Sequence, residues 1–267
     1  MIQEIQKALS AILGGVPLLR NANGAGRVFE LFIMTGIAER LRGKGFEVWL
    51  QRSDGTHIRP NDADRRFIQR GGAPSGIQAA SKGANNASTI GFRKISSGST
   101  WEIWNGIQFE GRSGAIHELD ISIVPQIVGN RLRQNGGYPF GRPRVAIECK
   151  DVGKPGSIDD TRAFVARLYD LTVLNWHQNY IRFPPPTQGI YPGTDTLNDS
   201  FYIAQRSFWI ENRHAFNAIA RRTGFTRGSA GLFRYYAIEP HGAVTAGSSQ
   251  ADALLDAVVN WVDSRFP

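Results

Sequence analysis

Two short apolar stretches of the sequence decide the fold. Gly114–Pro125 reads GAIHELDISIVP, and Arg144–Asp151 reads RVAIECKD. Each stretch shows the alternation of apolar and polar side chains that is typical of a β-strand. Each also places charged residues inside an otherwise hydrophobic segment. The two stretches therefore predict two sheet strands that carry chemistry as well as core.

Strict alternation divides each stretch into a polar and an apolar face. The first stretch is expected to place Glu118, Asp120 and Ser122 on one face and Leu119, Ile121 and Ile123 on the other. The second is expected to place Glu148 and Lys150 opposite Val145, Ile147 and Cys149. Because adjacent strands lie about 4.8 Å apart, Asp120, Glu148 and Lys150 converge if the two strands are neighbours.

Helical and strand patterns alternate along the rest of the chain, which predicts a single α/β domain. A strand at 101–109 is expected to form a hairpin with the first stretch through the GRSG turn at 111–114. The SIDD sequence at 157–160 has capping-box spacing and is expected to open a helix that ends near 175. The other predicted helices cover 2–13, 27–42, 211–222 and 249–266, and the other predicted strands cover 46–50, 201–209 and 232–238.

Residues 51–99 differ in composition from the segments around them. They contain seven Gly and eight Lys or Arg, against three Asp and no Glu. This composition predicts a basic, loop-rich insertion, which is either a plain surface loop or a substrate-binding element. The residues expected to contact nucleic acid lie in it and in the following basic loop: Arg65, Arg66, Arg70, Lys82, Arg93, Lys94, Arg131 and Arg133.

Overall composition narrows the class of partner. The 267 residues include 31 Lys and Arg against 23 Asp and Glu, a net charge of +8, which favours a polyanion such as nucleic acid. No apolar run approaches the length of a membrane span, so no membrane partner is expected. The single cysteine, Cys149, excludes a disulfide within the chain and a cysteine-based zinc cluster, and it fits a cytoplasmic setting.

The convergent charges indicate a hydrolytic reaction. Two adjacent carboxylates repel each other, and a divalent cation relieves that repulsion. Oxygen ligands without paired His or Cys suit Mg²⁺, with Mn²⁺ as the alternative. Lys150 is placed to orient or deprotonate an attacking water and to neutralise charge in a phosphoryl transition state. Phosphodiester hydrolysis is the chemistry that these residues predict.

The order of Asp120, a spacer and Glu148-Cys149-Lys150 resembles the PD-(D/E)xK nuclease superfamily. This resemblance implies the restriction-endonuclease-like fold, an αβββαβ core with a mixed central sheet flanked by helices. It further implies a metal bound by Asp120, Glu148 and the backbone carbonyl of Cys149, with Lys150 as the catalytic lysine. The sequence departs from the oldest form of the motif because Leu119, not Pro, precedes Asp120.

Many members of this superfamily also carry a glutamate in the first core helix, and Glu30 matches that glutamate by position. On the predicted helix, Glu30, Met34, Ile37 and Leu41 fall on one stripe, so Glu30 is expected to point inward as a catalytic residue. The alternative is that Glu30 lies in the first helical turn and interacts with the helix dipole. The five histidines show no pairing at ligand spacing, and His117 is expected to be structural.

The function expected from this resemblance is a Mg²⁺-dependent DNA endonuclease in restriction or anti-phage defence. It implies double-stranded DNA as substrate and a homodimer or larger homo-oligomer, since cutting both strands takes two active sites. Two alternatives stay open at this point. One is a nuclease of repair, recombination or mobile elements, and the other is a catalytically silent nucleic-acid-binding module of the same fold.

Overall fold

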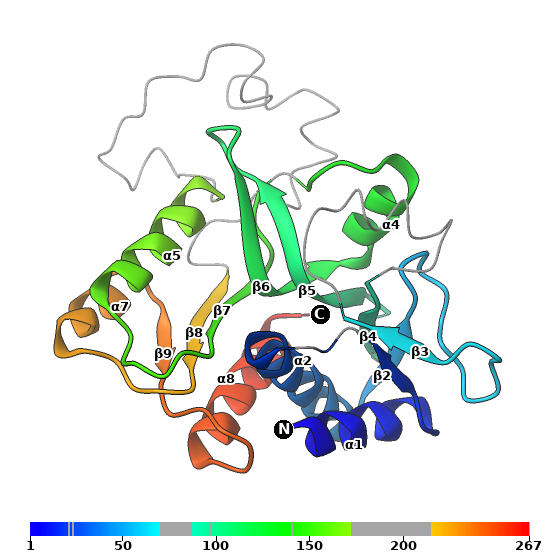
Figure 1. Ribbon diagram of the computed structural model, residues 1–267. Coiled ribbons are helices and arrows are strands. Elements are labelled where there is room, and N and C mark those ends of the chain that lie inside the picture. Colours follow the sequence, from blue (N-terminus) through cyan, green and yellow to red (C-terminus); the bar gives the residue numbers. More distant parts are fainter. Residues whose placement is uncertain are drawn as a thin grey trace.

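The computed structural model describes residues 1–20, 22, 24–69, 87–96, 98–139, 141–171 and 215–266. Within these residues, a seven-stranded sheet with the order β2-β4-β5-β6-β7-β8-β9 forms the centre of the molecule (Figure 1). Neighbouring strands from β2 to β7 are antiparallel, and β7, β8 and β9 are parallel. The strands are β2 (Phe46–Gln51), β4 (Thr89–Lys94), β5 (Thr100–Glu110), β6 (Ile116–Pro125), β7 (Val145–Lys150), β8 (Phe216–Arg221) and β9 (Glu239–His241). The expected α/β class with a mixed central sheet is confirmed.

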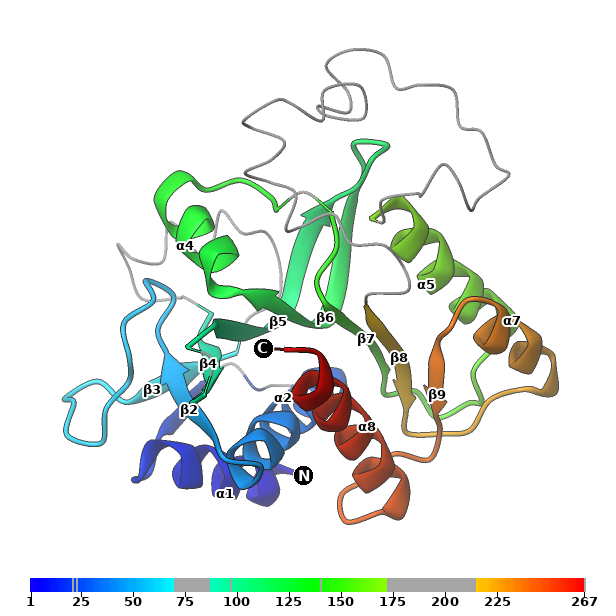
Figure 2. The same cartoon turned by 180° about the vertical axis from the view of Figure 1, so that it is seen from behind.

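Helices cover both faces of this sheet (Figures 1 and 2). On one face lie α1 (Ile2–Leu13), α2 (Ala25–Gly43) and α8 (Ser249–Arg265), and on the other lie α4 (Gln126–Asn135), α5 (Ile158–Asp170) and α7 (Ala230–Tyr235). We call the first apolar cluster the α2-side core, which includes Ile5, Phe29, Ile103, Ile121, Ile147 and Val258. We call the second the α5-side core, which includes Trp104, Ile107, Leu119, Ala146, Phe164 and Phe233.

Several local predictions are confirmed. The helices at α1, α2 and α8 and the β5–β6 hairpin lie within a few residues of their expected bounds. Ser157 caps α5 by accepting a hydrogen bond from the backbone N–H of Asp160, whose carboxylate accepts one from the Ser157 N–H in return. The expected end of this helix near 175 lies outside the described residues. None of the helices in the described ranges has the length and apolarity that a membrane span needs.

Part of the predicted insertion at 51–99 belongs to the central sheet. Strand β4 lies between β2 and β5, and its Ile90 and Phe92 side chains are fully buried. Gly91 pairs with Trp49 of β2, and a Cβ at this position would collide with the indole ring. The loop-rich prediction is therefore wrong for residues 89–94. Gly91 allows an aromatic ring to approach the backbone and does not mark a turn.

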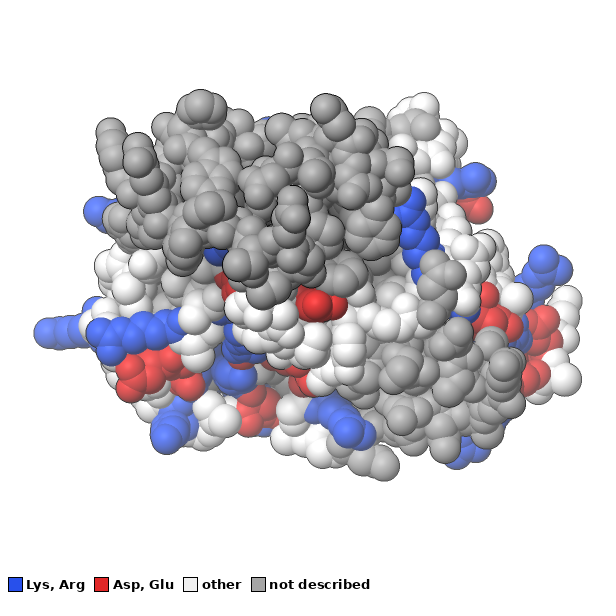
Figure 3. Space-filling view, turned by 90° about the horizontal axis from the view of Figure 1, so that it is seen from above, with Lys and Arg blue, Asp and Glu red and all other residues white. Residues whose placement is uncertain are grey.

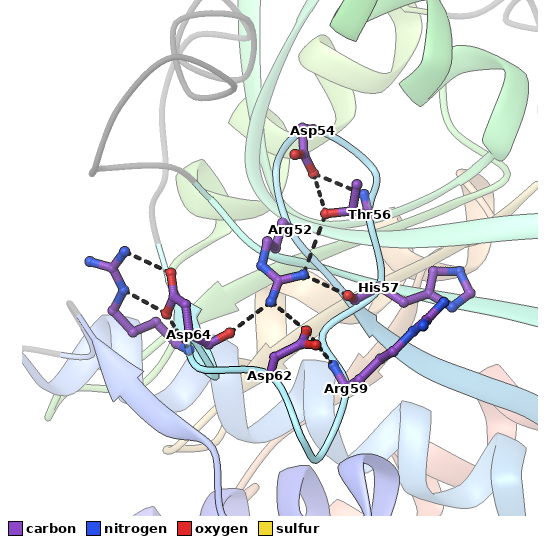
Figure 4. Close-up of polar contacts among 8 residues, drawn as sticks. Arg52, Asp54, Thr56, His57, Arg59, Asp62 and Asp64 are labelled. Carbon is purple, nitrogen blue, oxygen red and sulfur yellow. Dashed lines mark hydrogen bonds and ion pairs between the residues drawn. The ribbon is translucent and has the colours of Figure 1, made fainter.

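The first part of the same segment is an ordered loop (Figure 4). Arg52 donates hydrogen bonds to the carboxylate of Asp62 at 2.6 Å and to the carbonyl oxygens of His57 at 2.6 Å and Asp64 at 2.7 Å. These contacts bring together residues up to twelve positions apart. The loop then enters β3 (Arg66–Ile68), which pairs in parallel with β1 (Leu18–Arg20) in a small second sheet.

Two predictions in the C-terminal part are wrong. Residues 216–221, expected at the end of a helix, form β8. Residues 232–235, expected to begin a strand, belong to α7, which follows the 3₁₀ turn η2 (Arg227–Ser229). β8 is buried throughout between β7 and β9, so its polar residues Asn217 and Arg221 are buried as well and give no sign of a solvent-facing side. The strand predicted at 201–209 lies outside the described residues.

The β5–β6 hairpin exchanges its two faces in the middle. Leu119 packs in the α5-side core, whereas Ile121 and Ile123 pack in the α2-side core, so the prediction that the three share a face is wrong. The exchange occurs where Gly106 lies opposite Asp120, between the pairs Asn105–Ile121 and Ile107–Leu119. Gly106 has φ +61°, a left-handed conformation that interrupts regular strand alternation. The hairpin beyond it rises out of the sheet (Figure 1).

Candidate active site

Strands β6 and β7 separate after a short ladder. They pair only from Ile121–Ile147 to Ile123–Val145. Beyond that ladder, β6 stays with β5 in the hairpin, whereas β7 continues beside β8. We call this separation the fork, with residues 116–120 as its β6 arm and residues 148–150 as its β7 arm. The predicted site residues Asp120, Glu148 and Lys150 lie on these two arms.

A side-chain hydrogen bond spans the fork where the backbone ladder has ended. The backbone N–H of Cys149 donates to Oδ2 of Asp120 at 2.7 Å. In an extended strand the N–H and C=O of one residue point to the same edge, so the Cys149 carbonyl also faces the β6 arm. The Cys149 thiol is buried in the α2-side core, and this burial raises its pKa. Only the main chain of Cys149 therefore faces the fork.

The β7 arm holds its carboxylate between two cations. Glu148 is 1% exposed, and its Oε1 accepts a hydrogen bond from Nη2 of Arg167 at 2.7 Å and forms an ion pair with the Lys150 ammonium. The predicted shared face of Glu148 and Lys150 is confirmed, as is the opposite face of Val145, Ile147 and Cys149. The second oxygen, Oε2, is buried and has no hydrogen-bond partner among the described residues.

Glu30 reaches the β6 arm through Asn105. As the stripe predicts, Glu30 points inward with the buried residues of α2. The Asn105 amide on β5 donates to Oε2 of Glu30 at 2.7 Å and to the carbonyl oxygen of Asp120 at 3.0 Å. Because α2 begins at Ala25, Glu30 lies beyond the first turn, and the helix-dipole alternative is wrong.

Burial and mutual repulsion control the charges of the cluster. Burial, followed by the charges of Glu148 and Glu30, raises the pKa of Asp120 to about 8. Burial likewise raises the pKa of Glu30. Burial alone would lower the pKa of Lys150, but the Glu148 and Asp120 carboxylates outweigh it and raise this pKa. The site therefore favours the protonated form of Asp120 and the ammonium form of Lys150.

Sequence reasoning missed two polar members of the cluster. Asn105 is the amide inside the apolar part of β5, and an uncharged polar residue in such a strand was the available signal. Arg167 lies near the end of α5, nineteen residues after Glu148. No local pattern connects an arginine on a helix to a carboxylate on the preceding strand, so Arg167 had no comparable signal.

Most of the described residues that are predicted to contact nucleic acid have acidic partners. Four of them have acidic partners: Arg66 with Asp64, Arg93 with Glu47, Lys94 with Asp263 and Arg133 with Glu102. Arg65 and Arg131 are half-buried, and Arg70 and Lys82 lie outside the described residues. On the face shown in Figure 3, the described basic and acidic side chains are interspersed.

Arg133, one of the residues predicted to contact phosphate, is held by a buried carboxylate. Its guanidinium binds both carboxylate oxygens of the buried Glu102, each at 2.8 Å, and also donates to the Ser53 carbonyl. Only 9% of the Arg133 side chain is exposed. This bidentate arginine pair links α4 to β5, and phosphate contact by Arg133 stays a prediction.

His117 lies in a structural contact, as expected. Its Nε2 lies 2.7 Å from Oδ2 of Asp170 at the end of α5, and the same carboxylate accepts hydrogen bonds from the backbone and hydroxyl of Ser113 in the hairpin turn. These contacts tie the hairpin to α5. They do not include the carboxylates of the fork.

The described side chains of the fork do not form a metal site by themselves. Within the described ranges, no group of three or more His, Cys, Asp or Glu side chains is arranged to hold a metal ion. Asp120 Oδ2 and Glu148 Oε1 are instead engaged by protein donors. In comparisons with known proteins, no family model, no curated protein and no solved structure matches this chain.

Proposed function

We propose that this protein is a Mg²⁺-dependent DNA endonuclease of the PD-(D/E)xK type that acts in restriction or anti-phage defence. The observation that carries the proposal is the fork, because it gathers Asp120, Glu148 and Lys150 from two strands that separate at that point. The order of these residues along the chain is read from the sequence, and their proximity is read from the structure, so the two observations support the proposal separately. A homodimer or larger assembly follows from the same resemblance.

The donors of the fork fit a hard divalent cation. Glu148 Oε2 is a buried carboxylate oxygen that has no hydrogen-bond partner among the described residues, and such an atom is costly without a ligand. Asp120 Oδ2 and the edge of β7 that carries the Cys149 carbonyl lie across the fork from each other. These three oxygen donors suit Mg²⁺ or Mn²⁺. When bound, the metal would lower the pKa of a coordinated water and polarise a phosphate oxygen.

The protein's own residues would then divide the remaining work. Lys150 is an ammonium beside Glu148, which favours its role in neutralising charge on the phosphoryl transition state. Asp120 would release its proton as it becomes a ligand, because its raised pKa keeps it protonated at neutral pH before binding. Glu30, held by Asn105, would accept a hydrogen bond from water at the α2 side of the cluster.

The test is hydrolysis of supercoiled plasmid, linear duplex and single-stranded DNA with and without Mg²⁺. Asp120→Asn and Glu148→Gln remove ligand charge and should nearly abolish cleavage. Lys150→Met should lower the cleavage rate on the order of 10²–10³-fold while metal binding persists. Asp159→Asn is the matched control, because Asp159 is an exposed carboxylate on α5 that contacts Arg162.

The outcomes separate the proposed activity from its alternatives. Cleavage by the wild type and by the Asp159→Asn control, lost in the three site variants, supports the proposal. DNA binding that depends steeply on salt, without any Mg²⁺-dependent product, would identify a catalytically silent binding module instead. Robust cleavage by any of the three variants would place the active site elsewhere.

A further inference from the structure

Arg167 holds both arms of the fork with one guanidinium. Its Nη1 donates to the carbonyl oxygen of Glu118 on the β6 arm at 3.0 Å, and its Nη2 donates to Oε1 of Glu148 on the β7 arm at 2.7 Å. The two acceptors belong to strands whose backbone ladder has already ended. Arg167 therefore replaces the missing ladder contacts from the α5 side of the sheet.

The helix that carries Arg167 is firmly anchored. Its first turn is closed by the reciprocal capping contacts of Ser157 and Asp160, and Phe164 and Leu168 are buried in the α5-side core on either side of Arg167. The guanidinium lies 5.7 Å from the ring centroid of Phe164, within cation–π range. The position of the guanidinium is thus fixed by packing before any ligand binds.

This anchoring determines how Glu148 presents its two oxygens. Arg167 and Lys150 both engage Oε1, so Oε2 is the oxygen left for a ligand. Lys150 is 33% exposed and sits on a flexible stem, whereas the Arg167 guanidinium is also bound to the Glu118 carbonyl, so its hydrogen bond to Oε1 holds that oxygen in a fixed direction. Without the Arg167 guanidinium, Glu148 would be held by the mobile Lys150 ammonium.

We infer that Arg167 is a positioning residue, which fixes the separation of the two arms and turns Oε2 of Glu148 toward the divalent cation. This inference rests on the proposed function. It assigns the effect to the bidentate geometry of arginine and not to its charge. Lysine at the same position keeps the charge but has one nitrogen, and it cannot hold Glu118 and Glu148 in the same planar arrangement.

The variant Arg167→Lys tests this distinction because the charge near the cation stays constant. Mn²⁺ binding, measured by calorimetry on the full chain without DNA, should weaken about tenfold, which is typical when a group that orients a metal ligand is lost. Mg²⁺-dependent cleavage should fall with it. DNA affinity at saturating Ca²⁺ should stay at the wild-type value. The matched control is Arg162→Lys on the same helix, where Arg162 is exposed and forms an ion pair with the exposed Asp159.

Each alternative outcome has a distinct meaning. A melting curve shows whether Arg167→Lys is folded. If the folded variant binds Mn²⁺ with wild-type affinity, the positioning role is overturned. Loss of DNA affinity with unchanged Mn²⁺ binding would overturn it as well and would make Arg167 a phosphate contact. A wild-type protein that neither binds Mn²⁺ nor cleaves DNA would instead contradict the proposed function itself.

Discussion

The two arms of the fork carry carboxylates in opposite electrostatic surroundings. Glu148 on the β7 arm has Arg167 and Lys150 in direct contact. Asp120 on the β6 arm has one neutral donor, the backbone N–H of Cys149. The charges of Glu148 and Glu30 raise its pKa, and the Lys150 charge lowers it by a smaller amount. The β7 arm is therefore neutralised within the protein, whereas the β6 arm is not.

This difference shows where a bound cation would contribute most. A buried carboxylate with cationic partners is stable as an anion, whereas one without them keeps its proton. A divalent cation at the fork would supply to Asp120 the positive charge that Glu148 already receives from Arg167 and Lys150. The comparison predicts that the two carboxylates respond to neutralisation with opposite signs in the metal-free protein.

The largest effect is expected in the pH dependence of the free energy of unfolding, to which Asp120 contributes. Its pKa is raised from 3.8 to about 8, so the folded state binds one more proton than the unfolded state between these values. The contribution of Asp120 to stability should therefore fall by about 1.4 kcal/mol per pH unit as pH rises through this window, and level off above it. Urea unfolding of wild type and Asp120→Asn in a chelator measures the difference. If the difference in unfolding free energy between wild type and Asp120→Asn does not change with pH, the raised pKa of Asp120 is contradicted.

A smaller effect of opposite sign is expected from Glu148→Gln. The substitution leaves Arg167 and Lys150 without their carboxylate, and it should destabilise the metal-free protein by about 1–3 kcal/mol, because both cations are partly exposed and recover some hydration. Equilibrium unfolding at neutral pH, where Asp120→Asn should be stabilising, makes the contrast direct. Destabilisation of equal size in both variants would contradict the proposed asymmetry of the arms.

The smallest change in stability is expected from Glu30→Gln. The glutamine oxygen can still accept the hydrogen bond from Asn105, and the substitution removes a charge that burial disfavours. It should therefore stabilise the metal-free protein at neutral pH, by less than Asp120→Asn does. Cleavage should nevertheless fall strongly if Glu30 acts at the cluster, and higher Mg²⁺ or Mn²⁺ should restore part of it. Full activity would reduce Glu30 to a structural partner of Asn105.

Local patterns predicted the parts of the fold that depend on neighbouring residues. The β5–β6 hairpin, the capped start of α5 and the terminal helix α8 follow from turn residues, capping spacing and periodicity. The shared face of Glu148 and Lys150 followed from alternation within one strand. Each of these features depends on residues that are close in sequence, within one element or its immediate turn.

The remainder depends on contacts that no local pattern encodes. In the sequence, Gly91 is one of the glycines that indicate a loop-rich segment. Its actual role, to make room for the Trp49 ring of another strand, requires the tertiary structure. The face exchange at Gly106 moves Leu119 to a different core from Ile121, which alternation alone cannot anticipate. Asn105 and Arg167 enter the cluster because α2, β5, β6, β7 and α5 meet at one point, and their roles require the tertiary structure.

The mixed character of the central sheet also bears on how quickly its two halves can form. The β5–β6 hairpin closes a short turn, whereas β7 ends at Lys150 and its parallel neighbour β8 begins only at Phe216. Closing a longer loop costs more chain entropy before its contacts form, so long-range pairing is intrinsically slower. The β6 arm belongs to the antiparallel hairpin, whereas the β7 arm pairs with β8 in the parallel half. The fork therefore joins a part of the sheet that needs only a short turn to a part that needs a long-range pairing, and the carboxylates come together only when both have formed.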